Sequence, residues 1–247
     1  MSRDLVLAVH GTRSPAGGLV TEELRATVAG RLPRVSVHTG WVDLHTPTLA
    51  QTLSELGEAV VVPVFLTEGF HVATDIPEAV AEAGGRASVT ATLGDSLVAA
   101  VADRLLPFLE ATDAVVLAAA GSKRQLSNDQ VVATARTLAE IVDRPVSAGF
   151  LTAATPTVPD AVTAARSAGH RRVTIAPYLM APGLFSARLA HCGADAVAEV
   201  IGVHPTVVDG IVRRYLSATM HPRLRRREQQ ISWVSSTTGH QERESRA

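Results

Sequence analysis

Two histidines in the first third of the chain stand where parallel sheets usually do chemistry. His10 directly follows the apolar run Leu5–Val9, and His71 follows the run Ala59–Phe65 after a short turn. Short apolar runs bounded by turn residues are typical of buried strands. Because open parallel sheets bind ligands at the carboxyl ends of their strands, both side chains are expected at one sheet edge. Two neutral imidazoles there can bind a divalent first-row metal ion, or one can bind the ion while the other accepts protons.

Asp43 is expected at the same edge, at the end of the second strand. A carboxylate in this position can orient an imidazole N–H or bind the cation directly. A turn or helix-cap role, ahead of the helix that begins near Pro47, explains the residue equally well. His45 and Glu68 lie near this edge without a supporting pattern, so we treat them as bystanders.

The elements that position these residues alternate between strand and helix, which predicts a parallel α/β architecture. After the strand at 5–9, the first half is expected to contain a helix at 19–32, a strand at 35–38, a helix at 47–56, a strand at 59–65, a loop carrying His71, a helix from about 76, a strand at 88–92 and a helix at 96–109.

The same pattern then starts again, at an offset of about 110 residues. GFLTAATPTVPDAV from Gly149 aligns with GWVDLHTPTLAQTL from Gly40, and the run from Val173 aligns with the run from Ala59. We therefore expect two duplicated parallel-sheet α/β domains, residues 1–111 and 112–219, that face a shared cleft. Residues 220–247 are polar with clustered arginines, which predicts a flexible, solvated tail.

The two copies differ at the candidate site. His10 aligns with Ala120, Asp43 with Thr152 and His71 with Phe185, so that only the N-terminal copy keeps titratable groups. This difference predicts an asymmetric ligand that lies between the halves.

The segment after His10 is suited to an anion. Gly11 and Thr12 offer a backbone N–H and a hydroxyl near a helix start, and Arg13 offers a guanidinium fork for a carboxylate. Lys123 occupies the position of Arg13 in the second copy. Each cation taken singly is explained equally well as a solvated surface charge. The segment matches neither a P-loop nor a dinucleotide fingerprint.

Composition narrows the class of protein. The chain has 247 residues, of which 46% are apolar and 19% charged, as in ordinary globular proteins. Few aromatics (4%) and a net charge of −1 argue against nucleic-acid and membrane-surface partners. The single cysteine, Cys192, excludes an intrachain disulfide and a cysteine-cluster metal site. Without a signal sequence or an apolar run near the ~20 residues of a membrane span, the expectation is a cytoplasmic protein.

These motifs resemble those of the class II chelatases, specifically the sirohydrochlorin chelatase group in its long, two-domain form. His-Gly-Thr-Arg at 10–13 is similar to the family's His-Gly-Ser-Arg, with Thr12 in place of serine. Asp43 stands where the family commonly has a glutamate. The family pattern Gly-x-His-x-x-x-Asp-Ile-Pro is matched by Gly69, His71, Asp75, Ile76 and Pro77. The resemblance covers roughly residues 1–217 as two copies.

The resemblance implies a lyase that inserts Fe²⁺ first, or Co²⁺ next, into sirohydrochlorin for siroheme or cobalamin biosynthesis. It implies no cofactor beyond the substrate metal, and a monomer because the duplication supplies both halves. His10 and His71 are the expected metal ligands, catalytic together with Asp43; Gly11, Thr12, Arg13 and Lys123 are expected to contact the tetrapyrrole and its carboxylates. The alternative is a non-catalytic metal or tetrapyrrole carrier. A hydrolase that uses His10 as a base is weaker, because the chain lacks a Gly-x-Ser-x-Gly elbow.

Overall fold

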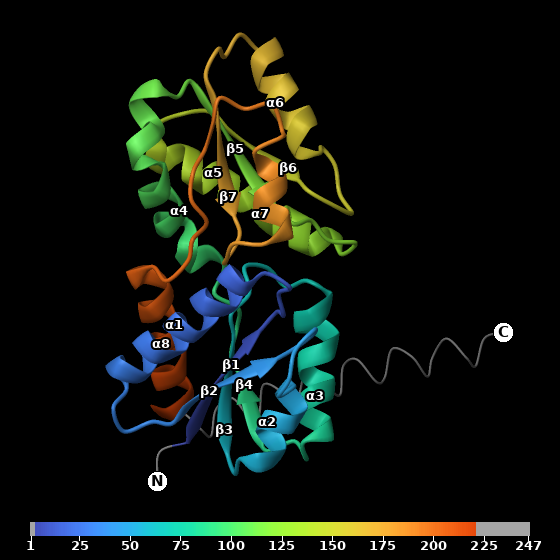
Figure 1. Ribbon diagram of the computed structural model, residues 1–247, viewed down its shortest axis with the longest axis vertical. Helices are drawn as coiled ribbons and strands as arrows, with labels where there is room; N and C mark the ends of the chain where they lie inside the picture. The colour runs from blue at the N-terminus through green and yellow to red at the C-terminus, as the bar shows by residue number, and fades with distance from the viewer. Residues whose placement is uncertain (1–2, 221–247) are drawn as a thin grey trace, which may run out of the picture.

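Two four-stranded parallel sheets, one in each half of the chain, form the framework of the molecule. The computed structural model describes residues 3–220, and the two α/β domains lie end to end (Figure 1). The predicted tail, apart from Met220, lies outside the described residues. No helix within residues 3–220 is both long and apolar enough to cross a membrane.

The N-terminal sheet has the strand order β2-β1-β3-β4. Its strands are β1 (Asp4–Val9), β2 (Val37–Trp41), β3 (Ala59–Pro63) and β4 (Ala87–Val89). The central strands β1 and β3 are buried almost throughout, as their continuous apolar runs predict for a sheet covered on both faces. In the register, Val9 faces Trp41 and Ala8 faces Pro63, so the residues after β1, β2 and β3 share one edge.

The C-terminal sheet repeats this arrangement in the order β6-β5-β7-β8. Its strands are β5 (Ala114–Ala119), β6 (Val146–Phe150), β7 (Val173–Tyr178) and β8 (Ala196–Val197). Ala119 faces both Phe150 and Tyr178 at the carboxyl edge, as Val9 faces Trp41 in the first sheet. The predicted fold, two duplicated parallel α/β domains, is confirmed.

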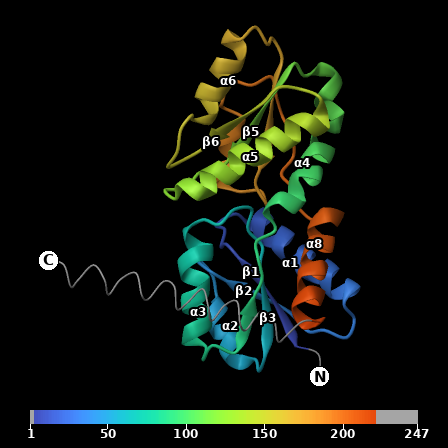
Figure 2. The same ribbon diagram turned by 180° about the vertical axis from the view of Figure 1, so that it is seen from behind.

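The helices cover both faces of the two sheets (Figures 1 and 2). They are α1 (Pro15–Arg31), α2 (Leu49–Glu55), α3 (Ile76–Glu82), α4 (Val98–Leu105), α5 (Gln125–Val142), α6 (Val158–Ser167), α7 (Leu184–Leu189) and α8 (Pro205–Met220). Thr48 before α2 and Thr157 before α6 each form a capping box with the residue three positions later. These two caps come from the repeated Thr-Pro-Thr sequence, so the duplication extends to how the helices begin.

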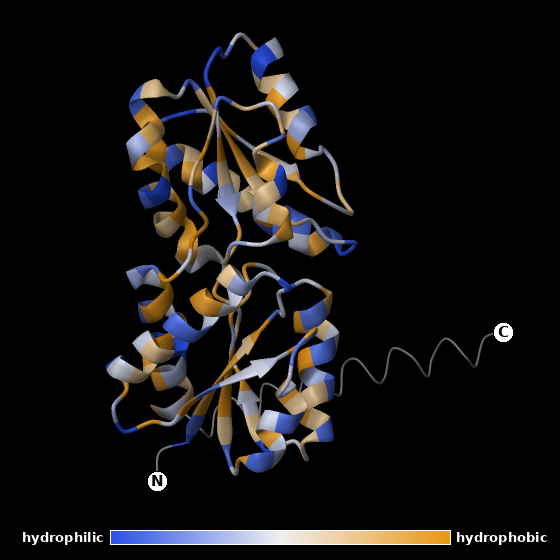
Figure 3. Ribbon diagram, in the orientation of Figure 1, coloured by the Kyte–Doolittle hydropathy of each residue, from blue (hydrophilic) through white to orange (hydrophobic). Residues whose placement is uncertain are grey.

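The last helix of each half packs on the other half. Helix α4 contacts α5 and β7 of the C-terminal domain, and α8 contacts β3 and α1 of the N-terminal domain (Figure 2). The Tyr215 hydroxyl on α8 donates a hydrogen bond of 2.6 Å to the carbonyl of Arg3. One apolar core cluster therefore includes residues of both halves, and apolar residues concentrate on the strands and the inner helix faces (Figure 3). Each sequence repeat thus ends in a helix, α4 or α8, that packs on the sheet of the other repeat.

The structure corrects two local predictions. His71 does not lie in a loop but begins a π-helical turn, η1 (His71–Asp75), that runs directly into α3. The helix predicted at 96–109 is divided into the 3₁₀ turns η2 (Gly94–Leu97) and η3 (Leu106–Ala111) with α4 between them. Pro107 in the first turn of η3 removes a backbone donor, which explains why α4 does not continue.

Candidate active site between the two domains

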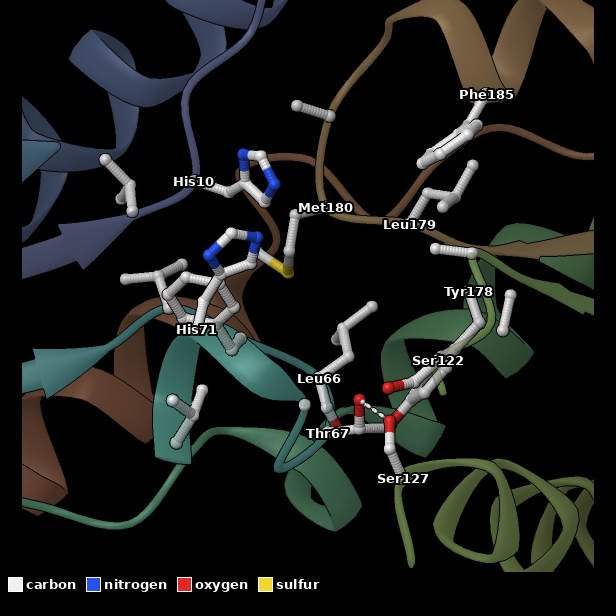
Figure 4. Close-up of a pocket in the computed structure, with 18 of the residues that line it drawn as sticks. His10, Leu66, Thr67, His71, Ser122, Ser127, Tyr178, Leu179, Met180 and Phe185 are labelled. Carbon is white, nitrogen blue, oxygen red and sulfur yellow. Dashed lines mark hydrogen bonds between the residues drawn. The ribbon is translucent and has the colours of Figure 1, made fainter. Parts of the chain in front are cut away.

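A cavity of about 390 Å³ lies between the carboxyl edges of the two sheets (Figure 4). Val9 and Val64 from the first domain and Ala119 and Tyr178 from the second mark the strand ends that open on it. Most of the wall is apolar, with hydroxyl groups from both halves. The position agrees with the rule that parallel α/β folds bind ligands at the carboxyl ends of their strands.

His10 and His71 lie together on the N-terminal wall of this cavity. Their ring centroids are 4.5 Å apart and the ring planes are inclined at 76°. His10 reaches this point from the end of β1 and His71 from the start of η1. Two imidazoles this close can bind one cation and leave its other coordination positions to water or to a second ligand.

Asp75 orients His71. Its carboxylate Oδ2 accepts a hydrogen bond of 2.5 Å from Nδ1 of His71, four residues earlier on the same turn. A carboxylate on one imidazole nitrogen fixes the tautomer and leaves Nε2 for a metal ion or a proton. An aspartate directly ahead of Ile76-Pro77 could also cap α3, but the structure shows no capping bond from the Asp75 side chain. The His-x-x-x-Asp spacing would have revealed this pair if a helical turn had been expected there.

His10 is held in a neutral state. Its Nδ1 lies 2.9 Å from the carbonyl oxygen of Gly11, which can accept the ring N–H. Although the side chain reaches solvent, the protein atoms around it in the cavity desolvate it, and this effect, followed by the nearby charge of His71, lowers its pKa. The Gly11 carbonyl and the carboxylates of Asp43 and Asp75 act in the opposite direction and are outweighed. A neutral imidazole is the form that binds metal ions.

Asp43 lies after β2 and close enough to His10 to influence its charge. Its side chain is exposed, and its Oδ1 accepts a hydrogen bond of 2.7 Å from the backbone N–H of Leu44. In the described part of the chain, no hydrogen bond joins Asp43 to either imidazole; that place at His71 is taken by Asp75. The turn role considered for Asp43 therefore has a visible bond, whereas its catalytic role stays a prediction.

The structure separates the four residues expected to contact the tetrapyrrole. Thr12 lines the cavity, and its hydroxyl accepts the N–H of Ser14 at 3.1 Å ahead of α1. Gly11 packs behind it, where a Cβ would lie 2.0 Å from the carbonyl oxygen of Asp43. Within residues 3–220, the cavity wall contains neither Arg13 nor Lys123, and both side chains are exposed. Lys123 instead lines an adjacent hollow of about 410 Å³.

His45 and Glu68, for which no catalytic role was expected, take part in contacts that hold the structure together. A nitrogen of the His45 ring bonds to the carbonyl of Thr12, and the ring packs 4.7 Å from Trp41. The side chain of Glu68 is exposed, while its backbone N–H donates to Gln130 in the other half.

The opposite wall comes from the second copy. Ala120, Thr152 and Phe185, the counterparts of the titratable residues, all line the cavity. Figure 4 shows Phe185 on the side of the C-terminal half, across from the two histidines. Within residues 3–220, no group of three or more His, Cys, Asp or Glu side chains is arranged to hold a metal ion. The two imidazoles thus face a wall of apolar side chains interspersed with the hydroxyl groups of Ser122, Ser127, Thr152 and Tyr178.

Comparisons with known proteins agree with the sequence motifs. The CbiX family model matches residues 4–106 and, a second time, residues 114–218. A sirohydrochlorin cobaltochelatase of Methanococcoides burtonii is 34% identical over 79 residues, which are 30% of this chain and 60% of the relative. The chain therefore matches less than two thirds of that relative's length.

Solved structures match over most of the chain. SirB from Bacillus subtilis with Fe³⁺ has a TM-score of 0.75 and 22% identity, covering 90% of this chain and 97% of SirB. CbiX, described as the terminal enzyme of siroheme biosynthesis in denitrifying bacteria, has a TM-score of 0.68 and 20% identity, covering 87% of this chain and 99% of CbiX. At these identities the similarity establishes the fold.

Proposed function

The chain belongs to the CbiX family of class II chelatases, and we propose that it inserts a divalent metal ion into sirohydrochlorin. The single observation that carries this proposal is the pair of imidazoles, His10 and His71, with ring centroids 4.5 Å apart in a cavity between the two domains. Metal insertion requires an ion that is bound and then released, together with removal of two pyrrole protons. The two rings supply both a metal-binding group and a proton acceptor.

The two imidazoles have different surroundings, and we assign them different roles. His10, whose pKa is lowered, stays neutral near pH 7 and is suited to binding the incoming ion. His71 has the carboxylate of Asp75 on Nδ1, which offsets the positive charge that a pyrrole proton brings to the ring. His71 is therefore the better proton acceptor once the ion has moved to the macrocycle. Asp43 contributes negative charge near His10.

The remaining wall suits a flat macrocycle. Tyr178, Met180 and Phe185 offer an apolar surface, while the hydroxyls of Thr12 and Thr152 can meet polar substituents. We propose that the carboxylates of sirohydrochlorin extend from the cavity toward the exposed Arg13 and Lys123. No cofactor beyond the substrate metal enters this reaction.

We propose Fe²⁺ as the first substrate metal and Co²⁺ as the second. Among the similar proteins, the M. burtonii relative is a sirohydrochlorin cobaltochelatase, and the SirB structure contains Fe³⁺. Imidazole and carboxylate ligands accept both divalent ions, so a direct comparison of rates decides between them. The product is siroheme in the first case and a cobalamin precursor in the second. Because the duplication supplies both walls, we propose a cytoplasmic monomer, which sedimentation of the purified protein tests for its oligomeric state.

The test is the rate of metal insertion, followed by the absorbance of sirohydrochlorin with Fe²⁺ or Co²⁺ under anaerobic conditions. The wild-type protein is expected to exceed the spontaneous rate, and His10→Ala and His71→Ala are each expected to lose roughly 10²–10⁴-fold. His191→Ala, an exposed histidine of the other half, is the matched control and keeps the wild-type rate. A non-catalytic carrier would change binding but leave the insertion rate at the spontaneous value, and wild-type rates in both site variants would refute the assignment.

A further inference from the structure

The segment that carries His71 is attached to both domains. Between the end of β3 and the start of η1, Val64 donates a backbone hydrogen bond to Ala8, and Leu93 donates one to Phe65. These bonds tie the first part of the segment to its own domain. The next residues, Leu66, Thr67 and Glu68, bond to the C-terminal domain. Figure 4 shows Leu66 and Thr67 beside Ser127 and Tyr178.

Three hydrogen bonds from the C-terminal domain meet these consecutive residues. The Ser127 hydroxyl donates to the Thr67 hydroxyl at 2.7 Å. The backbone N–H of Glu68 donates to Oε1 of Gln130 at 2.9 Å. A longer contact of 3.4 Å joins the Tyr178 hydroxyl to the carbonyl of Leu66. Ser127 and Tyr178 are buried, so the first and third of these bonds lie inside the interface and not on its rim.

The pseudo-symmetric contact on the other side lacks this chemistry. In the alignment of the two copies, Thr67 corresponds to Ala181 and Glu68 to Pro182, while Ser127 corresponds to Gly17 and Gln130 to Val20. The two segments still approach each other: a Cβ on Gly17 would lie 2.8 Å from the carbonyl oxygen of Pro182. However, alanine and glycine have no hydroxyl, proline has no N–H to donate, and valine has no acceptor.

Within residues 3–220, hydrogen bonds from the opposite half therefore reach the segment that carries His71 and not its counterpart in the second copy. The equivalent segment of the second copy leads to Phe185 and is held by close packing instead. Packing between apolar groups is non-directional, whereas hydrogen bonds to a hydroxyl and a backbone N–H specify the position of a particular stretch of chain. A group that must sit within a fraction of an ångström of a reacting metal needs the second kind of constraint.

We propose that Ser127, Gln130 and Tyr178 of the C-terminal half are positioning residues for His71. In this view the second copy does more than close the cavity: it fixes where the Gly69-Phe70-His71 turn places its imidazole relative to His10. The inference rests on the proposed function for its kinetic consequence, but the position of the ring can be measured without any reaction.

Gln130 gives the cleanest test because its side chain does not line the cavity, so its replacement removes no substrate contact. Gln130→Met removes the acceptor for the Glu68 N–H at similar size, and Gln130→Glu keeps an acceptor oxygen. We expect kcat to fall about tenfold or more in the methionine variant, with the KM for sirohydrochlorin unchanged, and to return in the glutamate variant. Ser54→Ala, an exposed hydroxyl on α2, is the control with wild-type kcat.

A second pair of variants separates positioning from stability. Thr67→Val alone leaves the buried Ser127 hydroxyl without this partner, whereas Thr67→Val with Ser127→Ala removes both ends of the bond. Removing both partners is far less destabilising than removing one. The double variant is therefore expected to regain the wild-type urea midpoint and to keep a low kcat. If kcat recovers together with the midpoint, the bond is merely structural and the inference is wrong.

The ring signals of His71 in a ¹H–¹⁵N NMR spectrum provide the readout that needs no turnover. They are expected to shift in Gln130→Met and to return in Gln130→Glu, while the signals of His191 stay in place. Should the wild-type protein not accelerate insertion, the proposed function fails, yet shifted His71 signals still support the positioning role. Unchanged His71 signals in both the methionine and the double variant overturn it, whatever the insertion assay shows.

Discussion

The loops that follow β1 and β5 each bring a glycine equally close to a neighbouring carbonyl group, yet the residues they carry have opposite chemistry. In the first loop, Gly11 packs against the carbonyl of Asp43, and in the second, Gly121 packs against the carbonyl of Thr152; a Cβ would lie 2.0 Å from the oxygen in both. Directly before these glycines stand His10 in one copy and Ala120 in the other. The α/β scaffold is therefore present in both copies, whereas the reactive groups at the strand ends are present in the first copy alone.

The largest expected effect tests the shared frame. Gly121→Ala and Gly11→Ala are each expected to lower the free energy of unfolding by about 1–3 kcal/mol, because a methyl group must displace backbone atoms. Gly121→Ala is expected at the upper end, since its φ of +86° is also strained for alanine. Urea unfolding measures the difference, with the exposed Gly57→Ala, which has open space around it, as the control. A Gly121→Ala protein as stable as the wild type would show that the close approach of Gly121 to the Thr152 carbonyl is not needed for stability.

The next effect concerns the acid that only one copy has. Asp75→Asn removes the charged acceptor from His71 and is expected to weaken Co²⁺ binding about 10–100-fold. In the second copy, the buried Leu189 occupies the equivalent position, so no acid supports Phe185. Titration with Co²⁺ followed by its visible spectrum measures the affinity, and Glu78→Gln on the exposed side of α3 serves as the control. Equal affinities in Asp75→Asn and wild type would show that the 2.5 Å bond has no bearing on metal binding.

A smaller effect is expected when the histidine is changed to its counterpart. In His71→Phe the N-terminal wall carries the residue found at position 185, and the positive charge that helps to lower the pKa of His10 is gone. The pKa of His10 is therefore expected to rise toward 6.5, although desolvation, the larger cause, still holds it down. An NMR titration of the His10 ring measures the shift. A pKa that stays at its wild-type value would mean that the two rings do not interact electrostatically.

The same pKa has a consequence for stability. Because the pKa of His10 is lowered in the folded state, the unfolded chain binds this proton more readily. The free energy of unfolding is therefore expected to fall as the pH drops from 6.5 through the folded-state pKa, and His10→Gln is expected to remove this part of the decrease. Urea unfolding at several pH values compares the two proteins, with His191→Gln as the control. If the free energy of unfolding depends on pH equally in wild type and His10→Gln, the pKa of His10 is not lowered by folding.

The smallest expected effect concerns the cations that both copies keep. Arg13 and Lys123 are exposed and lie outside the wall of the main cavity. An exposed ion pair contributes roughly 0.2–1 kcal/mol, so Arg13→Ala and Lys123→Ala are each expected to raise the KM for sirohydrochlorin less than about fivefold. The increase should shrink at high salt. A tenfold or larger rise would show that the tetrapyrrole reaches beyond the cavity and is bound firmly by both copies.

Periodicity and spacing predicted much of the frame. Continuous apolar runs predict central strands buried on both faces, and β1, β3, β5 and β7 are these strands. The repeated Thr-Pro-Thr predicted where α2 and α6 begin, because a hydroxyl ahead of a helix meets its free N–H groups. The exchange of α4 and α8 could not be predicted in this way, because an amphipathic helix shows which face is apolar but not which sheet covers it.

The candidate site, too, could be predicted from the sequence only in part. The strand ends before His10 and His71 placed both residues at one edge, and the alignment of the copies identified the opposite wall. The partner of His71 was not visible from the pattern, because whether Asp43 or Asp75 reaches the ring depends on a π-helical turn that the sequence read as a loop. The sequence also predicted that Arg13 and Lys123 contact the ligand. Both side chains are exposed and lie outside the cavity wall, and this exposure depends on how the whole chain packs.

The sequence alone determined that the protein has two parallel α/β copies and that only the first has histidines at the two site positions, since strand pattern and residue identity are local properties. The tertiary structure decided how those histidines are used. It brought the two rings to 4.5 Å, gave Asp75 to one of them, and set three residues of the second copy on the segment that carries it. Distances of this kind depend on how helices and loops distant in sequence pack together, and no short stretch of sequence contains that information.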